Sequence, residues 1–388
     1  MFFALRDLRT ARWRFALITG VVLLLSVLVA GLLGLTAGLT NQSVSALRAL
    51  GSGGASFVLP ADESGPVDLD RASLTAEQIE AVTDADPSAV PVGIARITVD
   101  DGTETGVSAV AVGLGAPVGS LVPPSGGEVL VSSGLAEEFD DDDNATIPAA
   151  SAGEFSGSDA ALTGPGSSAG DSLGVSGQSL AVAGDAGDLW HSHTPVLLAD
   201  LDTWRELAPR GGAATAIAVS SDPVNAAASS GADTIGALTG AGSGLAVVDG
   251  SELESALPSH RAEQTSLNTM TYMLLAVTAL VVGAFFAVWG MQRRREVAIL
   301  KALGASTATV VRDSLGQAAI VLAVGVGGGV ALVALLGSAI GGAVPFVVSA
   351  STTLTPALLL AGLGIVGAAV TLRPVVTADP TTALGAAR

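Results

Sequence analysis

Two short motifs in this 388-residue sequence have the spacing of known reactive sites. Residues 166–170 read Gly-Ser-Ser-Ala-Gly, the G-x-S-x-G pattern of a nucleophilic serine, which requires a strand before it and a helix after it. The surrounding Gly- and Ser-rich stretch predicts neither. Gly362, Gly364 and Gly367 have dinucleotide-fingerprint spacing but lie in a long apolar stretch, where small residues serve helix packing. Neither motif therefore predicts an enzyme.

The position of the only lysine excludes a P-loop, and the absence of cysteine excludes thiol chemistry. Lys301 is the only lysine, and it lies between Leu300 and Ala302 rather than between Gly and Ser or Thr. The chain thus has no P-loop, and ATP-driven work must come from a partner. The sequence has no cysteine, which excludes disulfides, thiol catalysis and cysteine-ligated metals.

Histidine and carboxylate residues were considered as metal ligands. His191 and His193 are two residues apart, so on a strand they would project from the same face, yet no third ligand can be identified. The four aspartates at residues 140–143 predict a solvated turn, because hard-cation loops space their carboxylates around a glycine. We therefore predict no metal site and no cofactor.

A second group of residues could contact a heme-like molecule. It contains His260, Glu263, Met270, Tyr272 and Met273, which gather where an acidic segment meets an apolar stretch. These residue types ligate or pack against heme. The alternative is a wet membrane boundary with packing methionines, and the sequence alone favours that alternative.

Three long stretches without charged residues predict the membrane-spanning helices that position these residues. They lie between Arg14 and Arg48, Glu263 and Arg293, and Asp313 and Arg373. A bilayer-spanning helix needs about 20 apolar residues. We predict spans at 15–39, 267–291, 315–340 and 354–372. The first is too long for a signal-peptide core and lacks a convincing cleavage site. Only 14% of the residues are charged, which argues against a purely cytosolic protein.

The distribution of charge predicts the topology. The formal net charge is −19, but the segment from Thr40 to Gln264 holds 32 acidic and 6 basic residues. By the positive-inside rule, the amphipathic lead at 1–14, the loop at 292–313 and the tail at 373–388 are cytoplasmic, whereas 40–266 is extracytoplasmic. We expect a multi-pass protein of the plasma or inner membrane with both termini inside. The outer acidity disfavours nucleic acid and anionic lipid and favours a neutral or cationic amphiphile.

The outer segment predicts a mixed α+β domain. Alternating residues at 93–99 and 106–112 flank an Asp-Asp-Gly turn and predict a hairpin. Thr75 and Gln78 have capping-box spacing before a helix to residue 85, and a second helix is expected at 200–207. Further strands are expected at 128–132, 179–183, 194–198, 216–220 and 245–249. Residues 151–178 are expected to form a flexible insertion.

The most informative segment follows the second span. A basic cluster precedes an apolar stripe at i, i+3 and i+6, and a glycine suited to a helix C-terminus closes the segment. These features predict a short amphipathic helix able to lie in a groove of another protein. The residues are Arg293, Arg294, Arg295, Glu296, Val297, Leu300, Lys301, Leu303 and Gly304.

Residues 294–305 and the closing residues 379–384 resemble the FtsX-like (MacB/LolC-type) permeases of ABC transporters. The layout of one span, a large outer domain and three spans is also similar. Residues 128–138 and 179–207 look like the MacB-like periplasmic core domain of that family. The four-span form with its lead is most similar to the heme-exporter (HrtB-type) and DevC-type branch.

This resemblance implies a homodimeric, non-enzymatic permease with two separate ABC ATPase subunits. Residues 296–304 would be the coupling helix, anchored at the membrane by residues 293–295. ATP hydrolysis would move spans one and two and the outer domain, and expel a hydrophobic or amphipathic compound such as heme. The glycine pairs Gly34/Gly38 and Gly325/Gly329, and a third at 337 and 341, permit close helix approach and dimerisation.

Two other functions remain open. A non-transporting transmitter could use the same motion to activate an extracytoplasmic partner such as a cell-wall hydrolase. A long coiled-coil outer arm would favour this reading, and the sequence has no such heptad run. A membrane-tethered enzyme is disfavoured because no catalytic constellation is found.

Overall fold

The computed structural model describes residues 12–61, 67–100, 106–140, 172–208, 212–219, 239, 244–302, 304–340, 345–347 and 349–376. The chain divides into two compact units. The helical unit contains Met1–Leu39 and Thr265–Arg388, and the outer unit contains Thr40–Gln264.

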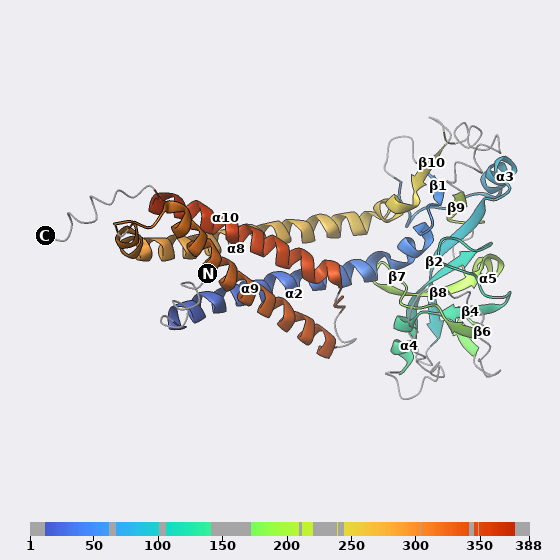
Figure 1. The fold of residues 1–388 in the computed structure, drawn as a ribbon. Helices are drawn as coiled ribbons and strands as arrows, with labels where there is room; N and C mark the ends of the chain where they lie inside the picture. The colour runs from blue at the N-terminus through green and yellow to red at the C-terminus, as the bar shows by residue number, and fades with distance from the viewer. Residues whose placement is uncertain are drawn as a thin grey trace. The chain divides into compact units, whose positions relative to one another are not determined.

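Four long apolar helices confirm the predicted membrane architecture. They are α2 (Arg12–Gly51), α8 (Pro258–Ala302), α9 (Thr307–Ile340) and α10 (Ala350–Val376). Each contains a segment long and apolar enough to cross a membrane, namely Phe15–Gly51, Pro258–Gln292, Thr307–Ala339 and Thr352–Val370. Helices α9 and α10 lie side by side in the helical unit (Figure 1).

Small residues bring α2 and α9 together. A Cβ on Gly329 would lie 2.6 Å from the Ser26 Cβ and 2.8 Å from the Leu23 carbonyl oxygen. The Ser26 hydroxyl donates to the Val326 carbonyl at 3.2 Å, which gives this close crossing a polar contact. The pair Gly325/Gly329 therefore serves helix packing within this chain.

Glycines of two other motifs also contact neighbouring segments of the helical unit, whereas residue 341 of the 337/341 pair lies outside the described residues. Gly34 faces the ring of Phe346, and Gly38 faces the carbonyl of Pro345. Gly364 packs against the side chain of Leu322. Small residues at these positions thus serve packing, as the sequence predicted for the fingerprint-like motif in α10.

The outer unit, shown in Figure 1, is built on one mixed sheet. Its strands are β1 (Ser56–Pro60), β2 (Val90–Asp100), β3 (Val107–Leu114), β4 (Glu128–Val131), β5 (Ser172–Val175), β6 (Gln178–Asp185), β7 (Trp190–His191), β8 (Thr194–Asp200), β9 (Ala216–Val219) and β10 (Leu245–Asp249). The order is β10-β1-β9-β2-β3-β8-β4-β6-β5, and β5 pairs back onto β2, so that the strands from β2 to β5 in this order close into a barrel. β3–β8 and β4–β6 are parallel.

Short helices connect these strands. They are α3 (Ala76–Ala85), α4 (Ser133–Asp140), α5 (Leu201–Leu207) and the 3₁₀ helix η1 (Gly250–Ala256). The predicted capping box is present, because the Thr75 side chain accepts from the Gln78 N–H and the Gln78 side chain accepts from the Thr75 N–H. The predicted β2–β3 hairpin is confirmed as well, with Ile94 opposite Val112.

One prediction about the outer segment was wrong at its C-terminal end. Residues 151–178 were expected to form a flexible insertion, yet residues 172–175 form β5 and pair with both β6 and β2. Leu173 and Val175 are buried in the barrel, while the serine and glycine between and around them gave the stretch its loop-like composition. Residues 151–171, including the G-x-S-x-G pattern, lie outside the described residues.

Helix α2 continues well beyond the predicted end of its span at residue 39. Its last three turns, residues 40–51, belong to the outer unit. Val44, Leu47 and Leu50 recur at helical spacing and are completely or almost completely buried in a core shared with Phe57 and Leu257. The end of α2 is therefore a core element of the outer domain.

Candidate functional site

The predicted coupling segment is the continuous end of α8. Residues 293–302 extend the same helix that begins at Pro258, so the separate short helix that we expected does not form. The reason is local, because no glycine or proline lies between Met291 and Leu303 to end the helix. Gly304 has a φ of +92°, the left-handed conformation typical of the residue after a helix.

Helix α9 begins directly after this turn. The Ser306 hydroxyl accepts from the Thr309 N–H at 3.2 Å and caps the helix. The segment is therefore a tight helical hairpin. Ile299, which the sequence analysis did not select, is 54% exposed on α8 just before the hairpin and presents an apolar side chain. Leu303 lies outside the described residues.

The predicted substrate residues divide between the two units. Met270, Tyr272 and Met273 lie on α8 in the helical unit, with exposed fractions of 55%, 68% and 66%. Met270 and Met273 are three residues apart and therefore share a helix face. His260 and Glu263 belong to the outer unit, and both side chains are engaged by other residues of that unit.

His260 anchors the start of α8 to the end of α2. Its side chain is buried, with Nδ1 3.1 Å from the hydroxyl of Ser43. One turn later Gln264 donates from Nε2 to the Thr40 hydroxyl at 2.6 Å. We call residues 40–51 the α2 foot and residues 250–264, which contain η1, Leu257 and the first two turns of α8, the α8 foot.

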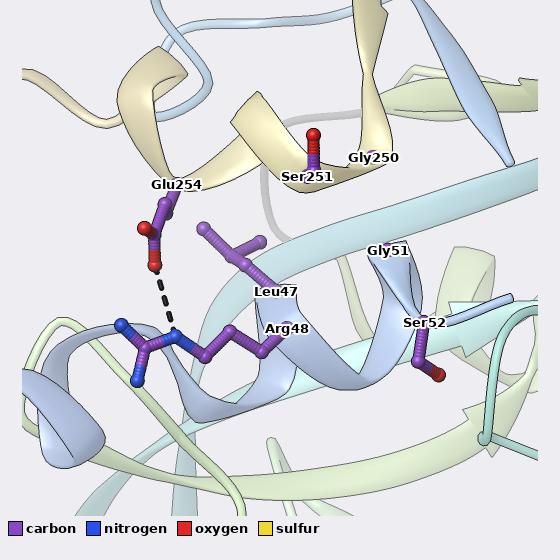
Figure 2. A pocket seen from close by; sticks show the side chains of 7 residues that line it. All are labelled: Leu47, Arg48, Gly51, Ser52, Gly250, Ser251 and Glu254. Atoms are coloured by element: carbon purple, nitrogen blue, oxygen red, sulfur yellow. Dashed lines mark hydrogen bonds and ion pairs between the residues drawn. The ribbon is translucent and has the colours of Figure 1, made fainter. Parts of the chain in front are cut away.

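A small cavity of about 150 Å³ lies between the α2 foot and η1 (Figure 2). Arg48 and Glu254 point toward each other across it and form an ion pair at 3.0 Å. Gly51 contacts the Gly250 carbonyl so closely that a side chain on either glycine would overlap the other segment. The lining residues are Leu47, Arg48, Gly51, Ser52, Gly250, Ser251 and Glu254.

The β7–β8 turn binds both feet. The Ser192 N–H donates to the Ser43 carbonyl at 2.8 Å, and the His193 N–H donates to the Gln42 carbonyl at 2.9 Å. His193 Nε2 lies 3.1 Å from Glu263 Oε2 on the α8 foot. The Ser45 hydroxyl accepts from the Trp190 N–H at 2.7 Å. Backbone and side-chain groups thus join the turn to the two helices.

His191 and His193 were expected to share a strand face, but they do not. Ser192 and His193 have φ values of 49° and 59° and form the turn, so His193 leaves the strand direction that His191 follows. His191 is buried, and its Nε2 lies 3.8 Å from Asp70 Oδ1. Among the described residues, no group of three His, Cys, Asp or Glu side chains is arranged to hold a metal.

Asp70 is the carboxylate most affected by this arrangement. The His191 imidazole, whose Nε2 lies 3.8 Å from the carboxylate, holds the pKa of the carboxyl below its ordinary value of 3.8. Burial opposes this shift, and the charges of His191 and Arg96 add to it. Of the four consecutive aspartates, Asp140 ends α4, and residues 141–143 lie outside the described part of the chain.

The comparisons with known proteins cover the connection between α8 and α9 and the apolar helices α9 and α10. Residues 268–380 match the FtsX-like permease C-terminal family. The chain is 32% identical over 142 residues to a Staphylococcus haemolyticus protein named as the HrtB permease of a hemin transport system. It is 27% identical over 133 residues to a Staphylococcus epidermidis protein of the same name.

These matches define a class and a distant relationship. The first covers 37% of this chain and 40% of the relative, and the second covers 34% and 38%. The chain thus spans about two fifths of the length of the relatives it matches. Residues 268–380 are an FtsX-like permease C-terminal domain, and the chain is a distant homologue of HrtB hemin transport permeases.

The sequence analysis missed the feet. Helical spacing of Val44, Leu47 and Leu50 beyond residue 39 is a signal that could have extended the first helix. The contacts of Ser43 have no comparable signal, because its partner His260 is 217 residues away.

Proposed function

We propose that this chain is the permease subunit of an FtsX-like ABC exporter, driven by a separate cytoplasmic ATPase. The observation that carries the proposal is the family match over residues 268–380, which includes the α8–α9 hairpin and the last two apolar helices. The proposed complex contains two permease copies and two ATPase copies in the plasma or inner membrane.

The orientation of the chain is part of this proposal. Both termini and the α8–α9 hairpin are cytoplasmic, and the acidic outer unit faces outward. The charge distribution supports this, since arginines flank the apolar stretches at the ends assigned to the cytoplasm. The hairpin then docks in a groove of the ATPase, with residues 293–295 at the membrane surface and Val297, Leu300 and the exposed Ile299 as apolar contacts.

The proposed cargo is a hydrophobic or amphipathic compound, and hemin is the first to test. The names of the distant relatives support hemin, and three exposed residues of suitable chemistry, Met270, Tyr272 and Met273, support a contact site on α8. His260 and Glu263 are bound to Ser43 and His193, which favours a structural role for these two residues.

Transport is favoured over pure signal transmission to an outer partner. A transmitter of that kind would use a long helical arm. In the described part of the outer unit, the helices inserted between strands are short: α3, α4, α5 and η1 have 10, 8, 7 and 7 residues. These elements pack on the sheet and offer no such arm.

The proposal is tested by hemin efflux from cells that carry the chain and an ABC ATPase partner. Efflux should fall to background after Glu296→Arg or after deletion of residues 297–303, because either change removes the docking surface. Glu77→Arg on α3 reverses a charge in the outer unit and serves as the matched control. Efflux that survives the deletion while the protein is in the membrane would contradict the coupling role.

A further inference from the structure

The two feet contact each other at successive turns and run antiparallel, so that later residues of the α2 foot pair with earlier residues of the α8 foot. The pairs are, in order, Thr40 with Gln264, Ser43 with His260, Arg48 with Glu254, and Gly51 with Gly250. Leu47 and Leu257 are buried in one core with these segments. The ladder begins at the boundary of the outer unit and continues to the end of α2.

Ser43 is the only residue of this ladder that also contacts the barrel in the described structure through the β7–β8 turn. Its hydroxyl meets His260 of the α8 foot, and its carbonyl accepts the Ser192 N–H. His193 of the same turn contacts Glu263 of the α8 foot. Three segments therefore meet at one buried serine, which is only 1% exposed.

The conformation of the turn indicates that these contacts fix it firmly. Ser192 and His193 both have positive φ, which is sterically unfavourable for residues with a Cβ. Non-glycine residues keep such conformations where the surrounding structure over-determines them. Here two backbone bonds to α2 and the contact with Glu263 supply that constraint.

Separating the feet would leave buried polar groups without partners. His260 is 4% exposed and Ser43 is 1% exposed, so water would not replace the lost contact without opening the core around Leu47. The backbone contact between Gly51 and Gly250 would also have to open. The structure thus resists a change in foot spacing more strongly than a joint displacement of both feet.

We propose that Ser43 is the positioning residue that fastens the α2 foot, the α8 foot and the β7–β8 turn into one rigid coupling body. Any movement of the spans then reaches the barrel as a joint displacement of both feet, with their spacing unchanged. This inference rests on the proposed function for the source of the movement. The rigidity of the body itself does not depend on it.

Rigidity is tested on the full chain without any ATPase. Ser43→Ala removes the hydroxyl that meets His260, and we expect amide hydrogen exchange at Trp190, Ser192 and His193 to rise about five- to tenfold, as for loss of one buried hydrogen bond. Ser52→Ala is the matched control, because the Ser52 hydroxyl donates to the nearby Ala49 carbonyl and forms no hydrogen bond to the α8 foot in the described part of the chain. Unchanged exchange in Ser43→Ala would overturn the assignment of Ser43.

Constant foot spacing is tested by crosslinking Thr40→Cys/Gln264→Cys with a short bismaleimide. The natural chain has no cysteine, so only the engineered thiols of the permease react. In cells with the ATPase partner and hemin as the probe, we expect the crosslinked protein to export at the rate of the uncrosslinked one. Each single-cysteine variant, treated with the same reagent, controls for modification alone.

The outcomes distinguish a failure of the constant foot spacing from a failure of the proposed transport function. Export that stops on crosslinking but continues in both treated single-cysteine variants shows that the feet must move apart, and it overturns the inference. If the uncrosslinked protein exports no hemin, the proposed cargo or transport has failed. The exchange measurement then still decides whether the three segments form one body.

Discussion

The two units of this chain bury apolar side chains in opposite ways. In the outer unit, large side chains such as Leu50, Phe57 and Leu197 are completely buried. In the helical unit, close contacts are made by glycines, while Leu280 and Leu358 are 73% and 72% exposed. The difference follows from the solvent: water drives large apolar groups inward, whereas hydrocarbon accepts them at the surface and leaves close packing to small residues.

The comparison is tested most strongly by shortening one leucine in each unit. Leu50→Ala should lower the free energy of unfolding of the outer unit by about 2–5 kcal/mol, because a cavity replaces a fully buried side chain. Leu358→Ala, on the exposed face of α10, is the control and should leave the free energy of unfolding unchanged. Pulse proteolysis of the full chain in detergent across a urea series measures both. Equal losses would contradict the contrast between the units.

Enlarging a glycine should give the next largest effect, this time in the helical unit. Gly329→Leu places atoms where Ser26 and the Leu23 carbonyl lie, and overpacking of this kind costs about 1–3 kcal/mol. Gly327→Leu, two residues away on α9, enters open space and should be tolerated. The midpoint of thermal aggregation in detergent, followed by size-exclusion chromatography, distinguishes them. A lower midpoint for both variants would indicate a general intolerance of bulk in α9.

A smaller effect is expected at the start of α3 in the outer unit. Thr75→Ala removes the side-chain acceptor of the capping box and should destabilise the outer unit by about 1 kcal/mol. Thr75→Ser keeps the hydroxyl and should retain most of the stability. The urea midpoint of the same proteolysis assay provides the measurement. A serine variant as weak as the alanine variant would mean that the methyl group, not the cap, matters.

The smallest effect depends on pH and concerns Asp70. Its pKa in the folded chain lies below 3.8, so its contact with His191 stabilises the fold above pH 3.8 and loses that contribution as the pH falls through the folded pKa. Asp70→Asn should therefore be less stable than the natural chain at pH 6, and the difference should shrink as the pH falls below 3.8. Urea unfolding followed by tryptophan fluorescence tests this. A stability difference that does not vary with pH would contradict the role of the carboxylate.

The sequence predicted those parts of the fold that depend on local pattern. The β2–β3 hairpin follows from alternating residues around a turn, and the Thr75 cap follows from a four-residue motif. The apolar helices follow from the stretches without charge. In each case the residues that decide the structure are close together in the chain.

The missed features depend on contacts between distant residues. The outer part of α2 was not predicted, because its apolar stripe is short and the core that it enters is completed by distant residues such as Leu253 and Leu257. Likewise, β5 has too short a pattern to be recognised before it pairs with β2 and β6. His193 was placed on a strand because the turn that redirects it is stabilised by carbonyls of α2.

The ladder between the feet has a consequence for how the protein is made. Thr40 and Gln264 are 224 residues apart, so the first-synthesised part of the outer unit must wait for its last-synthesised part. Contacts between such distant residues form slowly. During synthesis, Val44, Leu47 and Leu50 therefore lack part of their core until Leu253 and Leu257 have been made. Biogenesis has an interval in which this apolar stripe is open to wrong contacts.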